Sequence, residues 1–445
     1  MKSNGITAGS IRKQLLLLFF PIMLGTFFQQ LYNTVDAVIV GRFLGKEALA
    51  AVGGGTGTII NLLVGFFVGL SSGATVVISQ FYGANAERDV ERAVHTAIAL
   101  SVAGGVVIMA AGIAVSPTLL RLMGTPEDIL APAVVYISIF FTGMVPSLVY
   151  NMGSGILRAV GDTRRPLYFL IAGCAANIVL DMLFITVLHL GVAGAALATV
   201  LSQVVSMVLV MACLMKTNET YKVSLKKIGF SSAMLKSMVR IGLPAGLQSV
   251  MYAVSNIIIQ ANINVFGTNT IAAFTAYGKI DSMFWMIINA FGVAITVFAG
   301  QNFGAKKYDR LHQGTKQCLF MAAGTTVFIS AFFMLTAKYL YLLFTPDPDV
   351  VSAGLEMLYF LVPTYITYTS IEILSGAIRG TGDSFIPMVM TGAGICLLRI
   401  LWLVGVVPFR REITTVLASY PVTWVVTSIL FILHYKYGKW RKRMA

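Results

Sequence analysis

Two acidic residues, Asp36 and Asp181, lie deep within long apolar segments of the first half of this sequence, where no lysine or arginine lies at comparable depth. A carboxylate in a low-dielectric environment without a basic partner either takes up a proton or binds a cation. If the two carboxylates lie close together, they share one such ion. This chemistry is what ion-coupled transport requires, and acids inside membrane segments are usually functional because they are costly.

Polar side chains accompany both acids at helical spacing. They form a stripe on the first apolar segment, and an amide precedes Asp181 by four residues, which places both on one helical face. The set comprises Gln29, Tyr32 and Asn33 with Asp36, Asn177 with Asp181, and Asn151 and Thr199 on two further segments. Such oxygen ligands suit a hard cation such as sodium as well as a proton. Amides and hydroxyls alone could equally join helices, so the predicted coupling site depends on the acids.

A proline lies on the same apolar segment as the first acid. Pro21 precedes Asp36 by 15 residues. Proline inside a helix removes a hydrogen bond and kinks the helix. A kink that changes with the charge of Asp36 would supply the two-state element that alternating access needs.

The second half of the chain has a different set of charges within its apolar segments. Two are acidic and two are basic: Lys279, Asp281, Glu372 and Arg399. Because these charges sum to zero, ion pairs between helices could neutralise them. A structural or gating cluster and a substrate-binding role both remain open for this set.

The composition defines the elements that must position these residues. The chain has 445 residues, of which 57% are hydrophobic and 11% charged, and its mean hydropathy is +0.83. Soluble domains carry roughly 25% charged residues, and a membrane helix needs ~20 apolar residues. We therefore expect an all-α integral membrane protein of about twelve helices. They are predicted near residues 14–41, 49–80, 92–115, 131–158, 166–188, 191–215, 237–265, 271–301, 315–337, 351–379, 386–408 and 413–435.

The net charge of +14 has its origin in the loops. In a soluble protein this excess would suggest nucleic acid, but here most basic residues fall in the loops on the side of both termini. The positive-inside rule then predicts a multi-pass protein of the cell membrane with both termini in the cytoplasm and basic loops facing anionic lipid. We expect no nucleic-acid partner.

The sequence shows no signature of an enzyme. The four cysteines and four histidines are scattered and form no CxxC or HExxH pattern, so we expect neither disulfide nor zinc. Gly380-Thr-Gly-Asp383 fits the GxGD pattern of intramembrane aspartyl proteases. The corresponding motif of the first half is Ala-Val-Gly-Asp162, and both are expected at cytoplasmic helix ends. Because catalytic carboxylates must meet within the membrane, we interpret the motif as a chain-turning device.

Several segments recur at a nearly constant offset. Gln80–Ala84 returns as Gln301–Ala305, and Leu157–Pro166 returns as Ile378–Pro387, both 221 residues later. Each copy holds six predicted helices, so both cross the membrane in the same sense. The two-fold axis should therefore follow the membrane normal, with the substrate path between the halves. We predict an N-terminal lobe over residues 1–215, a cytoplasmic basic linker over 216–236 and a C-terminal lobe over 237–445.

The repeat does not extend to the acids. At the same offset Asn177 corresponds to Leu398 and Asp181 to Trp402. The second half thus keeps the scaffold and lacks the carboxylates, and we expect the coupling chemistry in the first half.

The pattern resembles the multidrug and toxic compound extrusion (MATE) family over the whole chain. The matching motifs are Pro21, Asp36-Ala-Val-Ile-Val-Gly41-Arg42, Ala50-Ala51, Gln80 with Gly83, and Gly155-Ile-Leu-Arg158-Ala-Val-Gly161-Asp162-Thr163 with Pro166. The resemblance implies two six-helix lobes that form a V around a central cavity. It implies export of small organic, often cationic, compounds in exchange for protons or sodium, with no further cofactor. We expect a monomer.

The resemblance extends to single residues. Asp36, Asn177, Asp181 and Thr199 match the cation or proton site of the DinF-like branch, and Pro21 matches the proline at which the first helix bends there. Another branch has acids on its seventh and tenth helices, whereas the seventh helix here has none and Glu372 has a different register. These residues could serve either protons or sodium as the coupling ion. Sodium is the one metal ion that this set could hold. A flippase for a lipid-linked precursor is the alternative, which a cavity lined by arginines would favour. Only Lys279 and Arg399 are candidates for such a lining.

Overall fold

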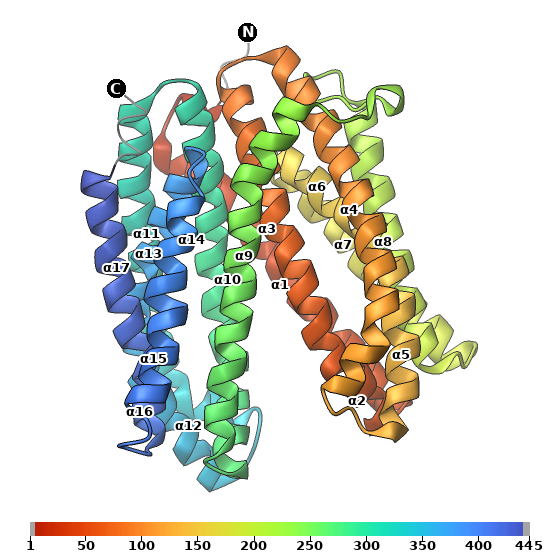
Figure 1. Cartoon of the computed structure of the whole chain (residues 1–445), viewed down its shortest axis with the longest axis vertical. Coiled ribbons are helices and arrows are strands. Elements are labelled where there is room, and N and C mark those ends of the chain that lie inside the picture. Colours follow the sequence, from red (N-terminus) through yellow and green to blue (C-terminus); the bar gives the residue numbers. More distant parts are fainter. Residues whose placement is uncertain (1–4, 439–445) are drawn as a thin grey trace. The chain divides into compact units, whose positions relative to one another are not determined.

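The computed structural model describes residues 5–438, and all regular elements in that range are helical. Lipid offers no hydrogen-bond partners, so the backbone N–H and C=O groups of a chain this apolar bond to one another within helices. Figure 1 shows these helices running alongside one another within each part of the chain. In the first half they are α1 (Ile11–Phe43), α2 (Lys46–Gly53), α3 (Gly55–Gly83), α4 (Glu87–Leu122), α5 (Glu127–Thr142), α6 (Met144–Ala159), α7 (Arg164–Asp181) and α8 (Gly191–Lys216). In the second half they are α9 (Ser232–Asn264), α10 (Thr268–Gly304), α11 (Tyr308–Leu342), α12 (Pro348–Leu361), α13 (Tyr365–Gly380), α14 (Phe385–Thr391), α15 (Leu398–Gly405), α16 (Ile413–Leu417) and α17 (Ser419–Tyr437).

The expected number of membrane helices is confirmed. Within the described residues, 11 helical segments are long and apolar enough to cross a membrane, or up to 12 when α5 and α6 count as one bent crossing. The bend between α5 and α6 is 47°. Pro146 lacks the N–H that would bond to the carbonyl of Thr142 four residues earlier, so the helix breaks at that turn. A Cβ at Gly143 would lie 2.9 Å from a methyl group of Val200, and the glycine thus lets the bend approach α8.

The repeated Gly-Asp motif ends helices in both halves, as expected. Gly161 and Gly382 follow α6 and α13 with φ angles of 95° and 90°, a left-handed conformation that glycine adopts without strain. The side chains of Asp162 and Asp383 each accept a bond from the backbone N–H three residues later, at 3.1 and 3.4 Å. Asp383 thus stabilises the turn between α13 and α14, in agreement with the chain-turning role predicted for the GxGD segment.

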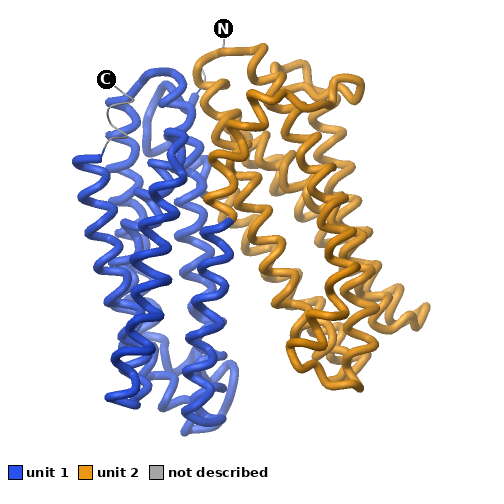
Figure 2. The backbone as a smooth tube through the Cα atoms, in the orientation of Figure 1, with its two compact units in different colours: residues 1–19, 247–445 blue, residues 20–246 orange. Residues whose placement is uncertain are grey.

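The chain forms two compact units, shown in Figure 2. One unit is Phe20–Gly246, and the other combines Met1–Phe19 with Leu247–Ala445. Helices α1 and α9 each contribute to both units, and the divisions fall next to Pro21 and Pro244. The predicted lobes 1–215 and 237–445 follow the sequence repeat instead and remain a prediction.

Two helices of the unit Phe20–Gly246 meet through glycines. Gly69 and Gly73 of α3 face Gly242 and Gly246 of α9. A Cβ at Gly69 would lie 2.5 Å from the Cα of Gly246, and one at Gly246 would lie 2.6 Å from the carbonyl oxygen of Phe66. Both helices present glycine at i and i+4, which lets backbones touch where lipid provides no hydrophobic driving force. We call these four residues the glycine contact.

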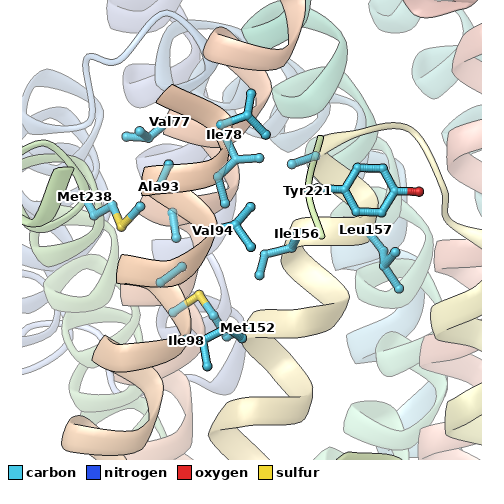
Figure 3. Packing of buried hydrophobic residues seen from close by; sticks show 14 of the residues in the cluster. Val77, Ile78, Ala93, Val94, Ile98, Met152, Ile156, Leu157, Tyr221 and Met238 are labelled. Atoms are coloured by element: carbon cyan, nitrogen blue, oxygen red, sulfur yellow. The ribbon is translucent and has the colours of Figure 1, made fainter. Parts of the chain in front are cut away.

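The segment between α8 and α9 packs on the same unit. Tyr221 and Val223 are buried with side chains of α3, α4 and α6, a cluster that Figure 3 shows from nearby. His95 fixes this segment: its Nδ1 lies 2.7 Å from the carbonyl oxygen of Glu91, and the N–H of Ser224 donates to its Nε2 at 3.0 Å. The predicted basic linker is thus a docked segment, and its buried side chains follow no simple sequence period.

We expect His95→Ala to release this segment. The change removes the acceptor of the Ser224 N–H, and an unpaired buried backbone group costs about 1–3 kcal/mol. Hydrogen–deuterium exchange of residues 221–231 should rise and the melting temperature in detergent should fall. Lys227→Ala is the control, because its 2.7 Å ion pair with Glu91 is exposed and such pairs contribute about 1 kcal/mol or less. Equal exchange in wild type and His95→Ala would contradict the assignment.

Candidate functional site

The two acids of the first half meet within the unit Phe20–Gly246. Asp36 is half-buried on α1, and Asp181 is fully buried as the last residue of α7. Their carboxyl groups lie close to one another. Both oxygens of Asp181 and Oδ1 of Asp36 have no hydrogen-bond donor in the described chain. A hydrogen bond between two carboxyl groups requires a proton on one of them, so this arrangement leaves room for one shared cation or proton.

No base compensates the two acids. The ion pairs found among residues 5–438 are Arg165–Asp162, Lys227–Glu91 and Arg410–Glu412, all outside this site. Two buried carboxylates without a base are unfavourable when both are charged. The predicted absence of a basic partner is therefore a feature of the folded structure as well as of the sequence.

Three elements place further polar groups beside the acids. The hydroxyls of Tyr32 on α1 and Tyr136 on α5 both lie near the hydroxyl of Thr199 on α8, and both tyrosines lie near both acids. Thr199 itself donates to the carbonyl oxygen of Ala195 at 3.1 Å. Tyr136 could not be recognised from the sequence, because one tyrosine within a long apolar run resembles a core residue.

The amide of Asn177 is the most unusual group of the site. Asn177 lies one helical turn before Asp181, is fully buried, and has no hydrogen-bond partner for either Oδ1 or Nδ2 among the described residues. Buried amides are almost always paired. Both polar atoms of Asn177 are therefore available to a ligand.

The remaining predicted residues lie outside this group. Gln29 and Asn33 are exposed on α1, whereas Tyr32 and Asp36 of the same polar stripe are half-buried. Asn151 donates to the carbonyl oxygen of Ser147 at 2.9 Å on its own helix, and no described contact joins it to the acids. The core of the site thus consists of Tyr32, Asp36, Tyr136, Asn177, Asp181 and Thr199.

A change of helical winding begins directly after Asp181. Residues Met182–Val187 form a π-helix, which continues α7 and ends before His189 with a positive φ of 53°. π-Helical turns are rare and occur frequently at functional sites. The main chain next to Asp181 thus departs from regular α-helical hydrogen bonding.

Within the described residues, the four charges of the second half form no ion pairs with one another. Asp281 accepts hydrogen bonds from Tyr365 Oη at 2.5 Å and Trp285 Nε1 at 2.7 Å, and Glu372 accepts one from Tyr368 Oη at 3.3 Å. Arg399 lies over the ring of Tyr420, and Lys279 is exposed. The reason is that tyrosine and tryptophan offer neutral donors and π-faces, which sequence positions alone do not locate.

The sequence of this chain matches a known family along most of its length. The family model MatE matches residues 21–183 and 244–403. The probable multidrug resistance protein YpnP of Bacillus subtilis is 28% identical over 99% of this chain and 98% of its own length. The probable multidrug resistance protein NorM of Thermotoga maritima is 24% identical over 97% of this chain and 94% of its own length.

Solved structures agree with these matches. A crystal structure of MATE in the bent conformation has a TM-score of 0.93 at 25% identity and covers 100% of this chain and 99% of that chain. The outward-facing conformation of a multidrug resistance MATE family transporter of the MOP superfamily has a TM-score of 0.90 at 25% identity, covering 98% and 97%. The DinF-like branch remains a prediction. The chain belongs to the MATE family of multidrug efflux transporters, which move compounds across membranes and are not enzymes.

Proposed function

We propose that this chain is a secondary active antiporter of the cell membrane, with both termini in the cytoplasm. It exports small organic, often cationic, compounds in exchange for protons or sodium, by alternating access and as a monomer. The contact between the carboxyl groups of Asp36 and Asp181, without a base, is the observation that carries this proposal. No cofactor beyond the coupling ion is needed.

The coupling ion acts by changing the charge between α1 and α7. Without the ion, two carboxylates repel one another strongly in a poorly solvated site. One bound proton or sodium ion leaves a single negative charge and holds Asp36 against Asp181. Ion binding therefore favours the arrangement in which these helices are close, and ion release favours their separation.

Helix α1 transmits this change. Asp36 lies on the same continuous helix as Pro21, which lacks the N–H of a regular turn. A bend at Pro21 moves Asp36 with little strain elsewhere. A cationic substrate that approaches Asp36 is attracted by the same carboxylates that hold the ion. Ion and substrate thus exclude each other, which is the requirement for exchange.

A transport assay tests the proposal. The protein is reconstituted into liposomes, a pH gradient or a sodium gradient is imposed separately, and a fluorescent organic cation is followed. We expect transport that stops when the effective gradient is collapsed. Export at the same rate with and without either gradient would contradict antiport. Transport of a lipid-linked substrate, but not of the organic cation, would favour the flippase alternative.

The amide of Asn177 distinguishes the two candidate ions. Sodium would take Asn177 Oδ1 as a ligand, whereas a proton shared by the two acids leaves the amide unused. If sodium drives transport, Asn177→Leu should weaken sodium activation tenfold or more, or about 1.4 kcal/mol. If protons drive transport, the same variant should keep its pH response. Asn151→Leu is the control, because no described contact joins Asn151 to the acids.

A further inference from the structure

Arg399 is a buried base without an acidic partner. It lies on α15, is 2% exposed, and is the only lysine or arginine with so little exposure among residues 5–438. Its Nη1 donates to Ser255 Oγ and its Nη2 donates to Thr423 Oγ1, both at 3.4 Å. Its Nε has no partner in the described chain. All these residues belong to the unit that contains Leu247–Ala445.

No described acid of that unit lies close enough to Arg399 to form an ion pair with it. No ion pair involves Arg399 within the part of the chain that the structure describes. Asp281 is held by Tyr365 and Trp285 as described above, so its lone pairs are directed to neutral donors. An arginine cannot lose its proton in a protein, and a buried charge without a counter-charge is strongly unfavourable. The contact with the Tyr420 ring, at 4.4 Å from its centroid, compensates this only in part.

We propose that Arg399, Ser255 and Thr423 form a binding site for a small monovalent anion, either a halide or a carboxylate group. One negative charge would neutralise the guanidinium, whereas a divalent group would leave a buried excess of negative charge. Ser255 is buried, and its hydroxyl hydrogen serves no described hydrogen bond, so it can turn toward an anion. Together with the unpaired Nε, this gives two donors that lack acceptors.

The surroundings of Arg399 suit a polar ligand. Thr423 lies on a stripe of buried hydroxyls of α17, together with Ser419 and Thr427, and the hydroxyls of these two have no partner in the described chain. Helix α17 comes close at Gly394, where a Cβ would meet the side chain of Thr427. Half-buried Tyr252 and Tyr420 lie beside Arg399.

The backbone before Arg399 also departs from regular helix. Residues Gly392–Leu397 form a π-helix between α14 and α15. At the repeat offset of 221 residues, Arg399 corresponds to Ile178, the neighbour of Asn177. Corresponding helices of the two halves thus present opposite charges, acids near Asn177 in one and a base in the other. A cation site and an anion site would follow from the same scaffold.

Bromide quenching of tryptophan fluorescence tests the proposal. The ring of Trp424 lies 5.4 Å from that of Tyr420, on which Arg399 rests, so a bound bromide would quench it. The full chain in lipid nanodiscs is titrated with sodium bromide against sodium sulfate at constant ionic strength. We expect a saturable quench in wild type, and Trp424→Phe identifies its source. Addition of acetate separates the two anion types, since a site for carboxylates loses the quench and a halide site keeps it.

Substitutions at Arg399 and Ser255 test whether these residues bind the bromide. Arg399→Gln should weaken bromide binding at least tenfold, Ser255→Ala should weaken it several-fold, and Arg399→Lys should retain part of it. Lys279→Gln is the matched control, because it removes one positive charge from an exposed position of the same unit. If Arg399→Gln does not fold, Ser255→Ala and a bromide-dependent rise of the wild-type melting temperature serve instead. Linear quenching that is the same in wild type and the Ser255 and Arg399 variants would overturn the proposal and leave the proposed antiport untouched.

Discussion

Asp36→Asn and Asp181→Asn are each expected to reduce export under an imposed ion gradient to the rate measured without a gradient. Either change removes one of two carboxylates that share a single ion, so the site can no longer alternate between a doubly charged and a singly charged state. The measurement is uptake of a fluorescent organic cation under an imposed pH or sodium gradient. Facilitated, gradient-independent movement of the compound should persist if the substrate path is intact.

The control for these variants is Asp162→Asn. It makes the same chemical change in the same unit, at a partly exposed helix end where Asp162 pairs with Arg165 at 3.2 Å. We expect near wild-type coupled transport from this variant. Undiminished coupling in both Asp36→Asn and Asp181→Asn would exclude the first-half mechanism.

Gly73→Val is expected to abolish correct folding. The added side chain would enter the backbone of α9 at Met238 and Gly242, and backbone atoms cannot be displaced as a flexible side chain can. Overpacking typically costs about 1–3 kcal/mol, and a helix-to-helix backbone collision should exceed that range. Size-exclusion chromatography in mild detergent should show aggregated protein in place of a single peak.

Gly57→Val provides the matched control. Gly57 lies on the same helix α3, and a Cβ there would meet no atom within 4 Å. The same glycine-to-valine change should therefore leave the elution profile and the melting temperature near those of wild type. A normal profile for Gly73→Val would show that α3 and α9 do not need their close approach.

Much of the fold could be predicted because membrane helices depend on length and hydropathy, which are local properties. The break at Gly143 is an exception, since the sequence predicts a continuous helix over 131–158. The cause is Pro146 near the start of α6, where the effect of a proline depends on neighbouring helices. The docked position of residues 221–231 was also not predictable, since it depends on His95, more than 120 residues earlier in the chain.

The candidate site was predictable to the extent that charge inside a membrane is costly. Asp36 and Asp181 stand out in the sequence because no base accompanies them, and the structure brings them together. Tyr136 and the isolation of Asn151 could not be predicted, because spacing along one helix does not tell which neighbouring helix it faces. Likewise, four charges that sum to zero do not form pairs when tyrosines are nearer, as Asp281 shows.

The glycine contact has a consequence for biosynthesis. Residues Gly242 and Gly246 leave the ribosome after all of α1–α8, yet α3 needs them to complete its packing. During synthesis, the face of α3 that packs on α9 therefore stays uncovered until the start of α9 has been translated. A gene divided between α8 and α9 would produce a first fragment without its last packing helix and a second fragment without Ile11–Phe19. Translation of this protein in one piece is thus part of how its two halves reach their final form.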